Sequence, residues 1–245
     1  MIVHLYSLVL NEEKMLPYFF RHYDGFVDQY FLFDNGSTDR TLQILGEHPR
    51  ASVEHVTFHS DSFVEEETVL YNTVWKRSKG VADWVIILNL DEQVVVPGMS
   101  VAAYLDDCRR NGISVIPCLG YEMVSDTFPE TPARLCDVVK TGVRWDRMDK
   151  VLIFNPNAIY DINYELGRHT CVPTGPAIYP IERKMKLLHY KYLGFDYLNE
   201  RHLFLRTGLR PKDVANKWGH KYLWSIDERR ADFERVRAQA VPVIP

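Results

Sequence analysis

Residues 82–97 of this chain read ADWVIILNLDEQVVVP, and the expected fold is built around them. Between Trp84 and Leu90 the stretch carries no charge, and β-branched residues stand at Val85, Ile86 and Ile87. Such a run is typical of a strand that is buried on both faces of a parallel sheet. The stretch therefore predicts a central strand that ends near residue 90.

Two adjacent carboxylates, Asp91 and Glu92, follow this strand directly. Open α/β sheets bind their ligands in the crevice beyond the carboxyl ends of the strands. Because buried carboxylates are costly, these two must face water, hydrogen-bond donors or a cation. A divalent-ion site and a solvated acidic turn are both open readings at this point.

The rest of the chain alternates between strand and helix patterns. Strand-like runs occur at residues 2–10, 29–33, 52–58, 113–117 and 151–154. Helix patterns begin at 11–13, with an apolar stripe at Leu16, Phe19, Phe20 and Tyr23, and recur at 41–45, 63–78, from 195 onward and at 224–240. This order predicts an α/β fold, a mostly parallel sheet flanked by helices, with a helical C-terminal tail.

Polar residues mark the ends of three of the expected parallel strands. They are Asn11 and Glu12, Asp34 and Asn35, and Asn89 with Asp91 and Glu92. Carboxyl ends of parallel strands meet at one rim, so these residues predict a binding site there. The chain has no G-x-G-x-x-G, G-x-x-x-x-G-K-[ST], H-E-x-x-H or G-x-S-x-G motif, which argues against dinucleotide-binding, P-loop, zincin and α/β-hydrolase enzymes.

Composition is that of an ordinary globular protein. The 245 residues are 46% hydrophobic and 25% charged, which suffices for one large core. The four cysteines form no CxxC pair, and no stretch of about 18 apolar residues or secretory leader stands out. We therefore expect a soluble cytoplasmic protein in a reducing compartment.

Charge is distributed unevenly along the chain. Residues 183–237 carry 14 Lys and Arg against 7 Asp and Glu, whereas the remainder has a net charge of −11. This separation favours anionic ligands or an anionic membrane face, and a solvated helical surface with both signs is the alternative. The Arg-rich C-terminal helix makes peripheral membrane contact, at the inner face of the membrane, one hypothesis.

Three segments of the chain resemble a known family. SLVLNEEKMLPYFFRHY, FLFDNGSTDRTLQIL and ADWVIILNLDEQVVVP are similar, in this order, to the N-terminal half of family 2-type glycosyltransferases with the GT-A fold. Further on, MDKVLIFNPNAIYDINYELGRHT and MKLLHYKYLGF resemble a branch with a Gly-x-His and a late His-Tyr. The resemblance implies a GT-A-like domain at 1–194, with a nucleotide-binding half at about 1–110 and an acceptor half at about 111–194. It leaves 195–245 as a helical extension packed on the same domain.

The resemblance also implies roles for individual residues. Asn11, Glu12 and Asp34 would bind the nucleotide, and Asn89, which replaces the first Asp of the family's Asp-x-Asp motif, would hydrogen-bond the ribose. Asp91 matches the metal-ligating Asp of that motif. His189 resembles the late histidine that completes the metal shell, and a structural histidine is the alternative. Mn²⁺ or Mg²⁺ is the expected cofactor, because a divalent cation stabilises charge on a departing diphosphate.

An inverting transferase needs a general base for the acceptor hydroxyl. The family often places this acid in a Glu-Asp dipeptide, which this chain lacks. Glu165, His169 and Asp126 remain as candidates, with Glu165 preferred among the carboxylates because Gly167 beside it allows close backbone approach.

The resulting hypothesis is an inverting, metal-dependent glycosyltransferase. Its partners would be a nucleotide-diphosphate sugar donor and a carbohydrate or lipid-linked glycan acceptor, with no nucleic acid. A module of the same fold that binds nucleotide sugars without turnover is the alternative, and Asn89 and the missing Glu-Asp pair favour it. A nucleotidyltransferase of related architecture ranks last, because the first strand runs into Asn11 rather than a Gly-rich basic loop.

Overall fold

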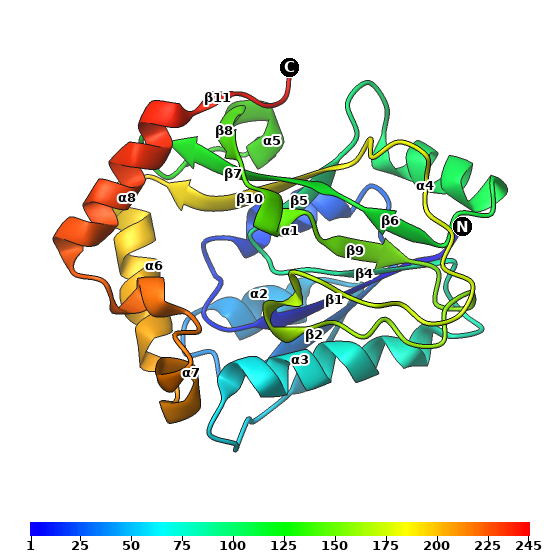
Figure 1. Ribbon diagram of the computed structural model, residues 1–245, viewed down its shortest axis with the longest axis horizontal. Helices are drawn as coiled ribbons and strands as arrows, with labels where there is room; N and C mark the ends of the chain where they lie inside the picture. Colours follow the sequence, from blue (N-terminus) through cyan, green and yellow to red (C-terminus); the bar gives the residue numbers. More distant parts are fainter.

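The computed structural model describes residues 1–245 and consists of two β-sheets flanked by helices (Figure 1). The first sheet has the order β3 (Ala51–His55), β2 (Gln29–Asp34), β1 (Val3–Val9), β4 (Trp84–Ile87), β9 (Val151–Phe154) and β6 (Val115–Pro117). Only β9 runs antiparallel to its neighbours. The predicted α/β fold with a mostly parallel sheet is therefore confirmed.

Strand β4 lies inside the first sheet, between β1 and β9, as its sequence predicts. All four of its residues are buried, and they alternate between two hydrophobic clusters. Trp84 and Ile86 belong to the larger cluster, whereas Val85 and Ile87 belong to a second one. The strand is thus covered on both faces, which explains why its sequence is apolar throughout.

Helices cover both faces of the first sheet. The larger cluster is built with α1 (Leu16–Tyr23), α2 (Thr41–Glu47) and α4 (Val101–Arg110), and the second with α3 (Phe63–Thr73) and the 3₁₀ turn η1 (Val74–Ser78). The expected apolar stripe of α1 is buried. The prediction that this helix begins at residues 11–13 is wrong, because the backbone of Asn11 is left-handed, with a φ of 50°, and the helix begins at Leu16.

The second sheet was not expected from the sequence. Its order is β11 (Val241–Pro242), β8 (Thr141–Arg144), β7 (Leu119–Ser125), β10 (Lys186–Leu193) and β5 (Glu92–Val95). β10 pairs parallel with β7 and antiparallel with β5. Strand β5 begins at Glu92, only a few residues after β4 ends. The stretch 82–97 therefore contributes one strand to each sheet.

The C-terminal segment is helical, as predicted. It contains α6 (Phe195–Thr207), α7 (Pro211–Ala215), the 3₁₀ turn η4 (His220–Leu223) and α8 (Ile226–Gln239). In Figure 1 these helices stack at one end of the two sheets, on the left of the view. Short turns complete the fold at α5 (Leu135–Val138), η2 (Asp146–Met148) and η3 (Leu166–Arg168). No helix has the length and apolar character needed to span a bilayer.

Candidate functional site

The centre of the candidate site is the contact between Asp91 and His189. The antiparallel register of β5 and β10 places His189 opposite Glu92, next to Asp91. Asp91 Oδ2 lies 3.2 Å from His189 Nε2. The Asp91 side chain is 31% exposed and that of His189 is 13% exposed, so the carboxylate opens to solvent while the imidazole lies behind it. The two residues assigned to a metal by resemblance are therefore neighbours in space.

A second carboxylate faces the other nitrogen of the same ring. Glu122 on β7 pairs in register with His189, and its Oε2 lies 3.0 Å from Nδ1, at ion-pair distance but outside hydrogen-bond geometry. Burial acts to lower the pKa of His189, but the charges of Glu122 and Asp91 outweigh it and raise this pKa to about 10. Burial likewise acts to raise the pKa of Asp91, and the positive His189 holds it well below its usual value. In the free protein His189 is therefore a cation between two carboxylates.

The Asp91–His189 pair fits a divalent ion in spacing and chemistry. Two ligands about 2.1 Å from an ion and at right angles to each other lie about 3 Å apart, close to the separation found here. Glu122 lies beside Nδ1, where carboxylates orient metal-ligating imidazoles, and an ion at Nε2 would displace the proton from that nitrogen. No group of three His, Cys, Asp or Glu side chains forms a ready metal cluster, so the remaining ligands would be water and substrate oxygens.

Glu92 turns away from Asp91 into the interior. Its carboxylate is fully buried, with Lys150 Nζ at 2.5 Å and Arg168 Nη2 at 3.8 Å. Burial acts to raise the pKa of Glu92, but Lys150 and Arg168 lower it below its usual value. Internal cations therefore neutralise this carboxylate. Sequence reasoning missed both, and the available signal was Lys150 at the start of the apolar run Val151–Phe154.

Asn89 is held by side chains from two other segments. Its Oδ1 accepts from Arg168 Nη2 at 2.6 Å and from the Tyr71 hydroxyl at 3.4 Å. The Tyr71 hydroxyl also accepts from the backbone N–H of Leu8 at 2.8 Å, which ties the ends of β1 and β4 together. Arg168, with φ at 58°, lies over the Tyr71 ring at 4.4 Å. The contact between Asn89 and a ribose stays a prediction. In this structure the Asn89 side chain already accepts hydrogen bonds from Arg168 and Tyr71.

The ends of β1 and β2 are joined through their polar residues. Asn11, whose φ is 50°, accepts at Oδ1 from the backbone N–H of Thr38 at 2.7 Å. Asp34 is fully buried and accepts from the N–H groups of Gly36 at 3.0 Å and Ser37 at 3.1 Å. Asn11 and Asp34 thus shape the turn between β2 and α2. Their predicted role in nucleotide binding remains untested.

Helix α6 covers this rim through Arg201, which sequence reasoning also missed. Arg201 Nη1 donates to the carbonyls of Leu10 and Asn11, each at 3.1 Å, and Nη2 pairs with Glu12. Burial raises the pKa of Glu12 to about 7, against the lowering effect of Arg201 and with a further rise from Asp91. A hollow of about 140 Å³ opens here, lined by Asn11, Glu12, Glu13, Lys14, Asp39, Tyr197, Glu200, Arg201 and Phe204.

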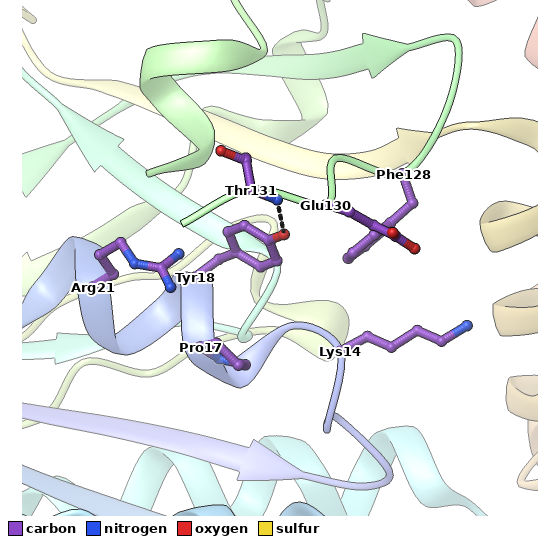
Figure 2. A pocket seen from close by; sticks show the side chains of 7 residues that line it. All are labelled: Lys14, Pro17, Tyr18, Arg21, Phe128, Glu130 and Thr131. Carbon is purple, nitrogen blue, oxygen red and sulfur yellow. Dashed lines mark hydrogen bonds between the residues drawn. The ribbon is translucent and has the colours of Figure 1, made fainter. Parts of the chain in front are cut away.

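A second, larger hollow of about 360 Å³ lies on the other side of Lys14 (Figure 2). Figure 2 shows α1 residues on one wall and the loop after β7 on the other. The lining residues are Lys14, Pro17, Tyr18, Arg21, Phe128, Glu130 and Thr131. Because Lys14 lines both hollows, the two are adjacent.

The three candidate bases do not gather at Asp91. Asp126 is 82% exposed and pairs with Arg237 at 3.3 Å, on the loop after β7. Glu165 is exposed and accepts from the Thr170 hydroxyl. His169 Nδ1 lies 2.8 Å from the Arg147 carbonyl, and burial, together with the charge of Lys150, lowers the pKa of His169 to about 4. Their catalytic roles stay predictions, and of the YELGRHT segment it is Arg168 that enters the site.

Comparison with known proteins yields only distant likenesses. No protein-family model matches the chain, and no curated protein matches it either. Among solved structures, a mycobacterial protein aligns at 16% identity and TM-score 0.31. The alignment spans 49% of this chain and 41% of the mycobacterial chain. A 4-diphosphocytidyl-2C-methyl-D-erythritol synthase from Anaerococcus prevotii aligns at 11% identity and TM-score 0.33, over 63% of this chain and 70% of that one. HddC from Yersinia pseudotuberculosis aligns at 8% identity and TM-score 0.32, over 76% of each. Likenesses at this level carry no information about activity.

Proposed function

We propose that this protein is a nucleotide-sugar-dependent glycosyltransferase that uses a divalent ion at Asp91 and His189. The observation that carries the proposal is the 3.2 Å contact between the partly exposed carboxylate of Asp91 and the imidazole of His189, with Glu122 beside Nδ1 of the ring. This pair lies just beyond the end of β4, the position at which α/β sheets bind ligands.

Each part of the site has a chemical task in this proposal. When bound, Mn²⁺ or Mg²⁺ would act as a Lewis acid on the diphosphate leaving group. Asp91 and His189 would hold it, and Glu122 would keep Nε2 of the imidazole directed toward it. Arg201 lies on the rim beside them, and its guanidinium can exchange Glu12 for diphosphate oxygens, which it binds with similar charge-assisted hydrogen bonds. Lys150 and Arg168 keep Glu92 out of this chemistry.

The proposal is tested by calorimetry and donor turnover with a panel of nucleoside-diphosphate sugars and Mn²⁺. Wild type should bind at least one donor more tightly with Mn²⁺ than without it, and should transfer or slowly hydrolyse that donor. Asp91→Asn keeps the size of the side chain but removes its charge, and it should abolish the effect of Mn²⁺. Asp107→Asn, at an exposed carboxylate on α4, is the matched control.

Two results would contradict the proposal. If Asp91→Asn binds and turns over every donor as wild type does, then the metal assignment is wrong. Donor binding by wild type without transfer or hydrolysis would favour the alternative, a binding module of the same fold. Support for that alternative comes from Asn89, which is uncharged where the resembled motif has its first Asp and which accepts a hydrogen bond from Arg168 at 2.6 Å.

A further inference from the structure

The walls of the larger hollow come from two distant parts of the chain. The Tyr18 hydroxyl donates to the carbonyl of Pro129 and accepts from the N–H of Thr131 at 3.3 Å, which fastens the loop after β7 to α1. The Phe128 ring meets the Tyr18 ring edge to face, with centroids 5.8 Å apart. Arg21 Nη1 donates to the Ala133 carbonyl at 3.0 Å and closes one end. The hollow is therefore a preformed feature of the fold.

The lining combines aromatic surface with hydrogen-bonding groups of both kinds. Phe128 provides a half-buried ring beside the buried Tyr18, Lys14 and Arg21 provide N–H donors, and Glu130 provides an exposed carboxylate acceptor. Lys14 and Arg21 each have further donors beyond their contacts with Glu200 and Ala133. A polyhydroxylated ring suits this lining, since its hydroxyls can donate to Glu130 and accept from the two cations while its C–H face packs on an aromatic ring.

Other ligand classes suit the lining less well. A strongly anionic ligand would face Glu130, and a cation would face Lys14 and Arg21. A lipid chain would need a mostly apolar lining, whereas five of the seven lining residues are not hydrophobic. The mixed signs therefore favour a neutral sugar over a charged or aliphatic ligand.

The position of the hollow relates it to the candidate centre. The Phe128 ring packs on the Tyr197 ring with centroids 4.6 Å apart, and Tyr197 lines the smaller hollow together with Glu12 and Arg201. We propose that the hollow between α1 and the loop after β7 is a saccharide subsite, which binds a neutral sugar unit of an extended glycan acceptor whose reacting end lies toward Asp91. The acceptor role rests on the proposed function, whereas sugar binding can be measured without it.

The test uses the full chain and neutral linear trisaccharides, namely maltotriose, cellotriose, laminaritriose and N,N′,N″-triacetylchitotriose, with trigalacturonate as an acidic comparison. Saturation-transfer NMR and calorimetry measure binding to wild type, Phe128→Ala and Glu130→Gln. At least one neutral trisaccharide should bind wild type, and both variants should weaken it tenfold or more. Glu130→Gln guards against a folding defect, because Glu130 is exposed, and thermal unfolding checks Phe128→Ala. Tyr160→Ala and Glu182→Gln, at exposed positions outside the hollow, should bind as wild type does.

The subsite is disproved if no neutral trisaccharide binds wild type, if the two variants bind as wild type does, or if trigalacturonate binds most tightly. The same variants should bind nucleoside-diphosphate sugars with unchanged affinity. If wild type binds no nucleotide sugar but binds a trisaccharide that both variants lose, then the subsite is supported and the glycosyltransferase proposal is refuted. If wild type binds a nucleotide sugar and the variants bind trisaccharides as wild type does, then the glycosyltransferase proposal is supported and the subsite is refuted.

Discussion

Asp91 Oδ2 lies 3.2 Å from His189 Nε2, although the two residues are 98 positions apart in the chain. The contact exists because β5 and β10 pair antiparallel in the second sheet, and β7 supplies Glu122 on the other side of the imidazole. The same ring thus meets the partly exposed carboxylate of Asp91 at one nitrogen and the buried carboxylate of Glu122 at the other. The exposed side is the one that a substrate can reach.

Glu122→Gln should weaken Mn²⁺ binding about 10- to 100-fold, which is the usual effect of losing the partner of a metal-ligating histidine. The amide keeps the size of the side chain but removes the charge that orients and polarises the imidazole. Titration calorimetry measures the affinity, with Glu182→Gln as an exposed control. Equal Mn²⁺ affinity in wild type and Glu122→Gln would mean that Glu122 only stabilises the fold.

Lys150→Met should lower the free energy of unfolding by about 3–5 kcal/mol, because it leaves the buried carboxylate of Glu92 without its closest cation. Urea denaturation measures the loss. In the double variant Lys150→Met/Glu92→Gln the loss should be smaller than the sum of the two single losses, since both charges are gone. Lys212→Met removes a surface ion pair with Glu65 and should cost at most about 1 kcal/mol. Strict additivity would contradict a direct Lys150–Glu92 interaction.

Arg201→Ala should weaken binding of a nucleoside diphosphate about tenfold or more and leave the matching nucleoside unaffected. A hydrogen bond to a charged group contributes about 1.5–3 kcal/mol, and the variant loses it only where phosphate oxygens are present. Arg206→Ala, at an exposed position on the same helix, is the control. If Arg201→Ala weakens nucleoside and diphosphate equally, then Arg201 supports the rim of the site rather than the phosphates.

His202→Leu should make the protein more resistant to acid. His202 is 1% exposed and neither ring nitrogen has a partner. Burial, reinforced by Lys191 and Arg229, lowers its pKa to about 3. A histidine with a lowered folded-state pKa stabilises the protein above its unfolded value of about 6.5, and this contribution is lost as the pH falls.

Between pH 8 and pH 5 the loss from His202 amounts to about 2 kcal/mol. Urea denaturation at both pH values should show that His202→Leu loses about 2 kcal/mol less than wild type does. His59→Leu, at an exposed histidine, should behave as wild type. Parallel losses in wild type and His202→Leu would show that His202 is not the acid-sensitive group.

The local patterns of the chain predicted most of the first sheet. Strand β9 has the predicted bounds, Val151–Phe154, and α3 begins at the predicted Phe63. Such elements depend on periodicity within about ten residues, which a sequence displays directly. The start of α1 was misplaced because Asn11 has a φ of 50°, which no helix accommodates, and α1 begins at Leu16.

The buried strand at Trp84–Ile87, the polar tip at Asp91 and the α/β alternation can be recognised from the amino-acid order alone, because burial and periodicity are local properties. Folding then places the Asp91 side chain partly in solvent, turns Glu92 inward to Lys150 and brings His189 and Glu122 into the site. These partners come from strands of the second sheet and from distant loops, where pairing register selects the neighbours. The amino-acid sequence contains no local pattern that specifies this pairing register.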